Sequence, residues 1–144
     1  MNASVKRDAG NLFFCAQVSD ADVYSSPSEI LKADGVYFYI DAGNYKLTAP
    51  DDGVFKIWCS NNGNIEAYEG KQGAWEKIQH EGLLVQSKHR AGGYDIELQV
   101  PLSFLNKTDV QPVRINFGLE ECTSIANYTE YVVHSQEKAS HTWC

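Results

Sequence analysis

The sequence predicts an all-β protein that folds as a single antiparallel β-sandwich, a two-sheet fold of the jelly-roll or immunoglobulin-like kind. Apolar and polar residues alternate with a period of two along most of the 144-residue chain, which is the pattern of half-buried strands. Clusters of Gly, Asn, Asp and Pro interrupt this alternation at short intervals. Many short strands at such spacing are typical of a sandwich. Residues 1–144 fit one domain, because a chain of this length forms one core.

Nine segments carry the strand pattern. They span residues 3–7, 11–19, 35–41, 53–59, 64–69, 83–90, 93–100, 112–120 and 128–134. Three breaks contain residues that tolerate positive φ, so we expect hairpins at 8–11, 61–63 and 91–93. We expect a helical turn at 26–32, where Pro27 is pre-set for an early helical position. We expect a tight turn at 101–105, because proline cannot continue a central ladder.

The negative charge of the chain argues against two classes of binding partner, nucleic acids and anionic membranes. The formal net charge is −7 and the isoelectric point is near 5.0, whereas nucleic acids and anionic membranes require a concentrated basic face. Neutral saccharides and a divalent cation are compatible with this charge. The sequence has no run of 18 apolar residues that would predict a membrane span. Residues 1–8 lack an apolar signal region, so we expect an intracellular protein or a piece of a longer secreted chain.

The cysteines and histidines lack the spacing of metal ligands. The four cysteines, Cys15, Cys59, Cys122 and Cys144, include no Cys-x-x-Cys pair, which argues against structural zinc. Buried thiols are the favoured interpretation for Cys15 and Cys59, and a disulfide is the alternative. Four histidines are interpreted as surface residues: His80, His89, His134 and His141.

Two acidic pairs, Asp20/Asp22 and Asp51/Asp52, lie in expected turns. Aspartate favours turns because its side chain bonds to nearby backbone N–H groups, and this is the favoured role. Carboxylates and carbonyls in such a loop could instead hold calcium, which takes 6–8 oxygen ligands. We therefore predict no cofactor, with calcium as the alternative.

The alternation assigns one face of four strands to the core. The expected core residues are Val36, Phe38, Ile40, Phe55, Ile57, Cys59, Tyr94, Ile96, Leu98, Val100, Val113, Ile115, Phe117 and Leu119. The opposite parity leaves a free face of mixed aromatic and polar residues: Tyr37, Tyr39, Asp41, Lys56, Trp58, Glu97, Gln99, Arg114 and Asn116.

Rings beside amides, carboxylates and a guanidinium are the groups that a saccharide requires. The C–H face of a sugar stacks on an aromatic ring and its hydroxyls bond to polar side chains. The alternative is that Tyr37, Tyr39 and Trp58 lie under a loop as a second small core. We expect Trp75 to be a ligand ring on a loop, and Trp143 to be a ligand ring or a packing plug. The predicted sugar-binding set is Tyr37, Tyr39, Lys56, Trp58, Trp75, Gln99, Arg114, Asn116 and Trp143.

Motifs of catalysis are absent from the sequence. It contains no Gly-x-Ser-x-Gly elbow, no His-Glu-x-x-His and no phosphate-binding glycine loop. A glycosidase needs a pair of carboxylates, and a pair carries little weight among 19 acidic residues. Haem ligation by Met and His is disfavoured because Met1 is the only methionine. We therefore predict a non-catalytic domain.

Five stretches resemble, in order, motifs of family 9 carbohydrate-binding modules. Residues 11–22 resemble the family's "LYvavevtD" strand, and residues 33–41, ADGVYFYID, resemble "gDsVEifiD". Residues 52–57 resemble "dDgqfri", and residues 113–118, VRINFG, resemble "irfNfg". The most specific match is GGYDIELQVPLSFL at 92–105, which is similar to "GGYtvEaaIPwsaL".

The resemblance implies a β-sandwich that binds polysaccharide as an accessory module of a secreted glycoside hydrolase. It also implies a sugar held between two tryptophans, and calcium in some members. The sequence departs from the family at Tyr37, which replaces an acidic residue, and at Gly35, which replaces a serine. Glu97 keeps the family's residue. Family members also carry strands before the first matched segment, so an N-terminal strand is expected to be missing here.

Two functions follow from these observations. The first is carbohydrate binding by a monomer, or by a domain fused to others, in an extracellular or periplasmic setting. The second is a structural or protein-interaction sandwich without sugar binding. Fold alone does not choose between them.

Overall fold

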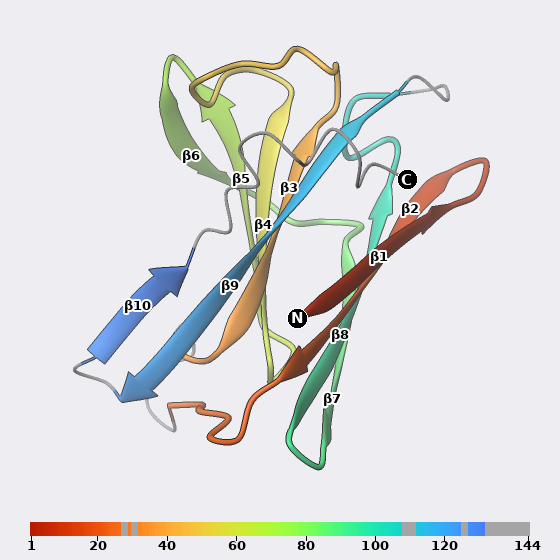
Figure 1. The fold of residues 1–144 in the computed structure, drawn as a ribbon. Helices are drawn as coiled ribbons and strands as arrows, with labels where there is room; N and C mark the ends of the chain where they lie inside the picture. The colour runs from red at the N-terminus through yellow and green to blue at the C-terminus, as the bar shows by residue number, and fades with distance from the viewer. Residues whose placement is uncertain (27–28, 30–31, 108–111, 125–126, 132–144) are drawn as a thin grey trace.

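The computed structural model describes residues 1–26, 29, 32–107, 112–124 and 127–131. Within these residues the chain forms ten strands and two sheets (Figure 1). The strands are β1 Asn2–Arg7, β2 Asn11–Ser19, β3 Gly35–Asp41, β4 Val54–Ser60, β5 Ile65–Lys71, β6 Ala74–Ile78, β7 Leu84–Arg90, β8 Gly93–Pro101, β9 Arg114–Ser124 and β10 Asn127–Tyr131. The described residues contain no helix that is long and apolar enough to cross a membrane.

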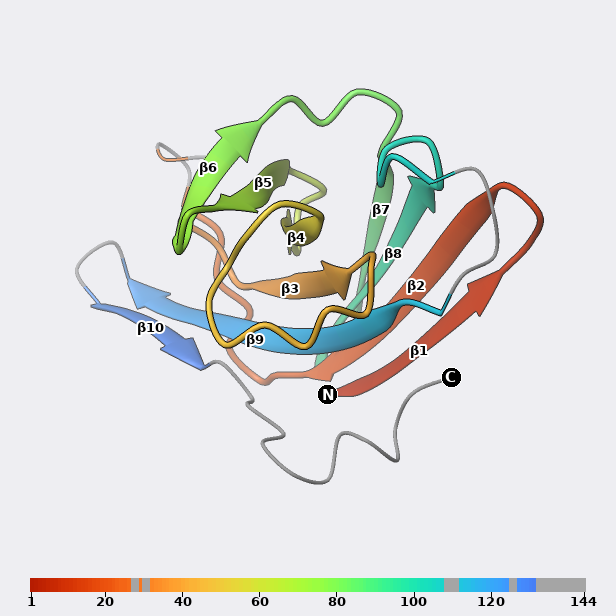
Figure 2. The same cartoon turned by 90° about the horizontal axis from the view of Figure 1, so that it is seen from above.

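The two sheets face each other as the layers of a sandwich (Figure 2). One has four strands in the order β1-β2-β8-β7, and the other has six in the order β10-β9-β3-β4-β5-β6. Every strand pair is antiparallel. The predicted all-β sandwich is therefore confirmed.

The expected hairpins join the strands that the sequence assigned to them. β1 pairs with β2, β4 with β5, and β7 with β8. Gly93 follows the last of these turns at φ +151°, and a Cβ there would lie 2.0 Å from the carbonyl oxygen of Val18. Only glycine lets β8 start this close to β2. The turn after Pro101 is also confirmed, since the Phe104 N–H donates to the Pro101 carbonyl at 3.0 Å.

Other expectations were incomplete. β6 was not predicted, and β9 continues four residues beyond its expected end at 120. β10 confirms the last strand to Tyr131, and residues 132–134 lie outside the described part. The helical turn at 26–32 includes residues outside the described part as well.

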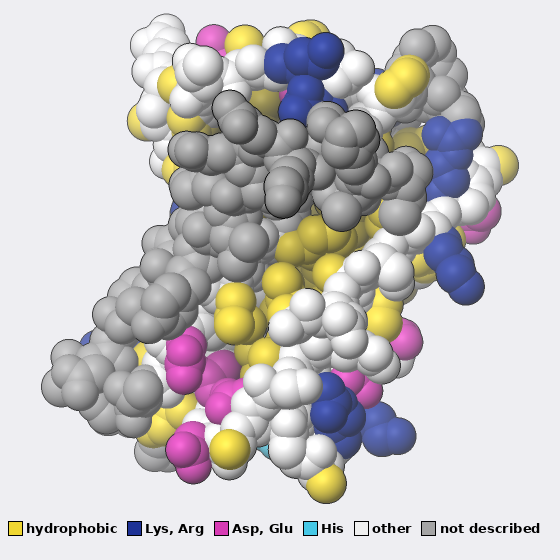
Figure 3. Space-filling view, viewed as in Figure 1, with side chains coloured by type: hydrophobic (Ala, Val, Ile, Leu, Met, Phe, Trp, Pro, Cys, Tyr) yellow, Lys and Arg dark blue, Asp and Glu magenta, His cyan; other side chains and the backbone are white. Residues whose placement is uncertain are grey.

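The core fills the space between the inner faces of the sheets. Phe14 of β2 packs on Phe38 of β3 with ring centroids 5.3 Å apart, and Phe38 packs on Phe117 of β9 at 5.8 Å. The predicted inner residues of β3, β4 and β8 are all buried. The predicted inner residues of β9, and Val113 just before it, pack against the core but are only partly buried. Apolar side chains are accordingly visible between β1 and β9 in the space-filling view (Figure 3). The alternation thus identified the core face of each strand.

The buried thiol expected at Cys59 is confirmed, whereas Cys15 is only partly buried. No disulfide bond joins Cys15, Cys59 or Cys122 within the described part of the chain, and Cys144 lies outside it. Cys59 is fully buried, and its burial raises the pKa of the thiol far above its usual value. A thiol in this environment stays protonated and packs as a small apolar group.

Candidate functional site

The outer face of the six-stranded sheet carries most of the predicted ligand residues. Strand register places Asn116 of β9 beside Tyr39 of β3, Tyr39 beside Lys56 of β4, and Lys56 beside Tyr68 of β5. Facing residues on one side of an antiparallel sheet have Cβ atoms about 4.5–5.5 Å apart. The four side chains therefore form one continuous row across four strands.

Aromatic rings surround the ammonium group of Lys56. Its Nζ lies 5.4 Å from the ring centroid of Tyr37, 4.7 Å from that of Tyr68 and 5.4 Å from that of Trp75. The ring of Tyr39 lies between two of these rings, with its centroid 6.0 Å from that of Tyr37 and 6.2 Å from that of Trp75. We call these four rings and Lys56 the ring cluster. A cation over a ring face is worth about 0.5–1 kcal/mol at an exposed site, so Lys56 helps to hold the rings in place.

Trp75 reaches the ring cluster from a strand rather than from a loop. β6 is the edge strand beside β5, and Trp75 pairs with Gly70 there. The expectation of a loop tryptophan is therefore wrong. Trp75, Tyr39 and Tyr68 are all partly exposed, which leaves ring surface available at the edge of the sheet.

Trp58 does not offer the exposed ring that the sequence predicted. Its side chain is 3% exposed, and Tyr37 beside it is 8% exposed. A Cβ at Gly35 would lie 2.7 Å from Trp58 Nε1, so the indole packs over the bare backbone at the start of β3. Trp58 and Tyr37 are therefore buried, as the alternative of a second small core expected, whereas Tyr39 is partly exposed. Trp58 Nε1 is buried without a hydrogen-bond partner among the described residues.

A charged pair borders the ring cluster at the β5–β6 edge. Lys77 forms a salt bridge with Glu66 Oε1, and the Tyr68 hydroxyl donates to Glu66 Oε2. Burial alone would raise the pKa of Glu66, but the hydrogen bonds from Lys77 and Tyr68 and the charges of Lys77 and Lys56 lower it below its usual value. Glu66 is therefore ionised at neutral pH and fixes the orientation of Tyr68. Neither Tyr68 nor Glu66 was predicted, although Ala67 at the core parity of the 64–69 strand implies that both point outward.

The whole chain, residues 1–144, matches the family model described as carbohydrate family 9 binding domain-like. The chain belongs to this family. The match confirms the resemblance seen in the sequence and the prediction of a carbohydrate-binding domain.

Solved structures agree on the fold of this family 9-like domain. A family 9 carbohydrate-binding module from Caldicellulosiruptor kristjanssonii in complex with glucose is 16% identical, with a TM-score of 0.70 over 95% of this chain and 68% of that one. The complex of a family 9 module from the same organism with cellotriose is 17% identical, with a TM-score of 0.71 over 96% of this chain and 68% of that one. At this identity the likeness concerns the fold. None of the curated proteins compared with the chain matches it.

One predicted ligand residue, Gln99, lies on the other sheet from the ring cluster of the family 9-like domain. Gln99 and its neighbour Glu97 lie on β8 and therefore belong to the four-stranded sheet. The free face deduced from the sequence is thus two faces on opposite sides of the sandwich, because alternation does not assign a strand to a sheet. Trp143 lies outside the described residues.

β9 contributes the remaining predicted residues, Arg114 and Asn116, both partly exposed. Arg114 pairs with Asp41 in the register of β9 and β3. The Asn116 Oδ1 accepts a hydrogen bond from the Phe117 N–H at 2.9 Å, which fixes the amide beside Tyr39. Both residues place hydrogen-bonding groups along the β9 side of the ring cluster.

The acidic turns of the domain bond to backbone N–H groups. Asp20 Oδ1 accepts from Asp22 N at 2.9 Å, and Asp51 Oδ1 accepts from Asp52 N at 3.0 Å and Gln72 N at 3.2 Å. Across the described part of the chain, no three His, Cys, Asp or Glu side chains are grouped so that they could hold a metal ion. The contacts of these aspartates are those of the favoured turn role, and the calcium alternative stays a prediction.

Proposed function

We propose that this domain binds saccharide at the ring cluster on the outer face of the six-stranded sheet. The observation that carries the proposal is the convergence of Tyr39, Tyr68 and Trp75 around Lys56, with all three rings partly exposed. Three large rings beside one cation are more than a solvated sheet face needs. They provide the apolar surface on which the C–H face of a sugar stacks.

Polar groups at the rim of the ring cluster suit the hydroxyl groups of the same ligand. The Lys56 ammonium, the Arg114 guanidinium and the Asn116 amide all donate hydrogen bonds, and the Asn116 oxygen also accepts. Lys77 and Glu66 compensate each other at the opposite rim. This mixture suits a neutral polyhydroxylated ligand better than an anion, which would need several uncompensated cations.

The first ligands to test are β-glucans, because family 9 modules of similar fold were solved with glucose and cellotriose. A domain of this kind would act without catalysis, by holding a polysaccharide close to an enzyme carried on the same protein. We therefore place it outside the cell or in the periplasm, as a monomer or as one domain of a larger chain. The negative net charge is compatible with a neutral polysaccharide as the partner.

Substitution of Trp75 by alanine tests the proposal. We expect isothermal titration with cellotriose to show an affinity reduced by at least about 2- to 13-fold, since a stacked ring contributes about 0.5–1.5 kcal/mol in addition to the burial of its area. Trp75→Phe keeps a ring and should recover part of the loss. Glu76→Ala, a change at the next residue on the opposite side of β6, should bind as the unmodified domain does.

Two results would contradict this assignment. Unchanged affinity in Trp75→Ala would remove the ring cluster from the binding site. Failure to bind cellotriose, xylotriose, mannotriose and chitotriose would instead favour the structural or protein-interaction sandwich.

A further inference from the structure

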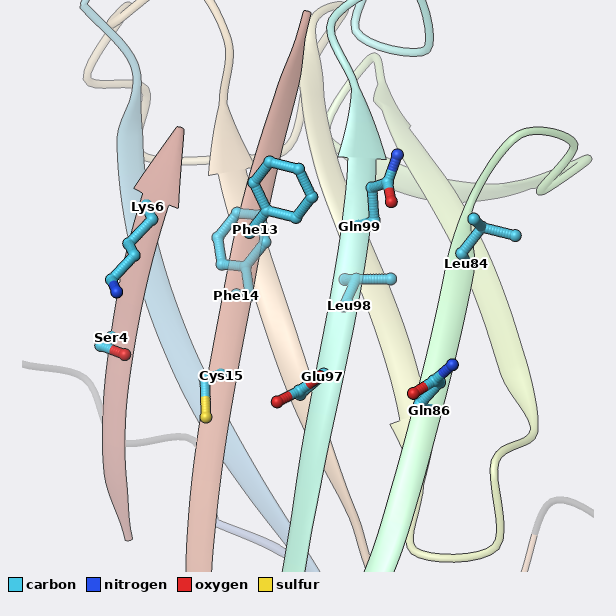
Figure 4. A pocket seen from close by; sticks show the side chains of 10 residues that line it. All are labelled: Ser4, Lys6, Phe13, Phe14, Cys15, Leu84, Gln86, Glu97, Leu98 and Gln99. Carbon is cyan, nitrogen blue, oxygen red and sulfur yellow. The ribbon is translucent and has the colours of Figure 1, made fainter. Parts of the chain in front are cut away.

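The opposite side of the sandwich carries a cavity that the ring cluster does not reach. It has a volume of about 540 Å³ and lies on the outer face of the four-stranded sheet (Figure 4). Its lining comes from β1, β2, β7 and β8. A volume of this size falls within the range of about 300–1,000 Å³ that is typical of small-molecule sites.

Strand register arranges the lining in two rows. The first row crosses the sheet from β1 to β7 as Lys6, Phe13, Gln99 and Leu84. The second row crosses it as Ser4, Cys15, Glu97 and Gln86. Long side chains make up the first row, whereas the short side chains of Ser4 and Cys15 open the second beside the Phe13 ring. The sheet face is therefore hollowed next to an aromatic ring, as the close view shows (Figure 4).

Phe13 is the ring of this surface. It is 37% exposed, whereas its neighbour Phe14 on the core side is 2% exposed. A large apolar ring exposed to water in the middle of a sheet face is a feature of surfaces that bind a ligand or a partner. The edge of the hollow at β7 adds Leu84, which is 61% exposed.

Planar polar groups stand beside the ring. The Gln99 amide is adjacent to Phe13 across β2 and β8, and its Nε2 donates to Asn11 Oδ1 at 3.0 Å. This bond fixes the amide and leaves the Gln99 carbonyl oxygen directed elsewhere. Glu97 and Gln86 form the next pair, so the cavity offers both acceptors and donors within one residue spacing of the ring.

The charges of the lining indicate a neutral ligand. Lys6 and Glu97 are its two charged residues and cancel in formal charge. Burial and the negative charges of Glu97 and Asp95 raise the pKa of Cys15, so the thiol in the hollow stays uncharged at neutral pH. A phosphate or sulfate would find one cation and a repelling carboxylate, whereas a polyol satisfies both groups by hydrogen bonds.

We infer that this hollow is a second saccharide-binding site, in which a sugar ring lies against Phe13 and bonds to Gln99, Glu97 and Gln86. The inference rests on the proposed function for the class of ligand, and on its own residues for the position. Two sites on opposite outer faces let one domain hold two segments of polysaccharide, and linked binding raises the apparent affinity for a polymer above that of either site.

Amide chemical shifts separate the two sites, because each site lies on its own sheet. In a titration of the 15N-labelled domain with cellotriose, xylotriose, mannotriose and chitotriose, we expect saturable shifts around Phe13 and Gln99 with at least one sugar. Phe13→Ala should weaken the affinity derived from these shifts by at least about 2- to 13-fold, because the stacking of one ring is lost together with the burial of its area. Gln17→Ala, on the same face of β2 but outside the cavity lining, should leave it unchanged. Trp75→Ala should affect only the shifts of the six-stranded sheet.

Each outcome supports or overturns the inference. Shifts confined to β3, β4, β5 and β6 would overturn the second site and leave the proposed function intact. Shifts confined to β2 and β8 would support the second site and overturn the ring cluster as a site. Silence on both sheets with all four sugars would overturn both. Shifts around Phe13 that depend on protein concentration without sugar would show a contact between copies of the chain instead, and would also overturn the second site.

Discussion

The two sheets have matching inner faces and different outer faces. Both inner faces follow the same alternation of buried apolar residues. The outer face of the six-stranded sheet gathers large rings around Lys56, and part of that surface is buried at Tyr37 and Trp58. The outer face of the four-stranded sheet instead exposes one phenylalanine among amides and short side chains. Alternation therefore fixes which face is the core, whereas the chemistry of each outer face depends on which strands become neighbours.

The largest expected loss of stability distinguishes the inner from the outer face of β2 at two adjacent residues. Phe14→Ala should lower the free energy of unfolding by about 3–5 kcal/mol, because it leaves a cavity against Phe38 and Phe117. Phe13→Ala, one residue away on the outer face, should cost less than half as much. Urea unfolding monitored by circular dichroism measures both. Equal losses would mean that the outer face of β2 is as tightly packed as the inner face.

The next effect tests the buried part of the ring-rich face. Gly35→Ala should lower the free energy of unfolding by about 1–3 kcal/mol, because its Cβ would lie 2.7 Å from both Trp58 Nε1 and the Cys59 carbonyl oxygen. Gly10→Ala is the matched control, since the nearest atom to its Cβ is 4.0 Å away. An unchanged free energy of unfolding in Gly35→Ala would show that the Trp58 indole can leave its position. That result would support the original prediction of an exposed Trp58 ring.

The smallest effect concerns pH at the junction between the sheets. Asp34 is 1% exposed and accepts backbone hydrogen bonds from Tyr24 N and Cys122 N, each at 2.6 Å. Burial raises the pKa of Asp34 to about 6. The two backbone hydrogen bonds lower this pKa, and the nearby Asp20 raises it further. The pKa values of Asp8 and Glu66 are lowered instead, so their contributions to stability change with pH in the opposite direction.

The sign of the Asp34 contribution follows from its raised pKa. Between about pH 4 and 6 the folded protein holds a proton that the unfolded chain has released. The stability contributed by Asp34 is therefore complete below that window and is lost as the pH rises through it. Asp34→Asn cannot ionise, so the advantage of the unmodified domain over this variant should shrink from pH 4 to pH 7 in thermal unfolding. An advantage that grows with pH would contradict the assignment.

The fold was predictable because it depends on local patterns. Alternation and turn residues located the strands closely, including β8, whose inner residues are all buried. β6 escaped prediction because it is a short edge strand with charged Glu76 and Lys77 beside Trp75. Such a strand has no continuous apolar parity, so its pairing with β5 is what defines it.

The candidate site was only partly predictable, because it depends on contacts between distant residues. The sequence identified Tyr39, Lys56 and Asn116 as outward-facing, and the register places them side by side. It could not assign Gln99 to the other sheet, since strand order is a property of long-range pairing. The burial of Trp58 depends on the missing side chain of Gly35 on the neighbouring strand, and only the pairing of β3 with β4 reveals it.

A crystal structure of the domain with bound cellotriose would show directly whether the ring cluster holds the sugar. We expect a glucose ring stacked on Trp75 or Tyr39, with hydroxyl groups bonded to Lys56, Arg114 or Asn116. A cellotriose held entirely by residues outside the ring cluster, with Trp75 and Tyr39 untouched, would contradict it.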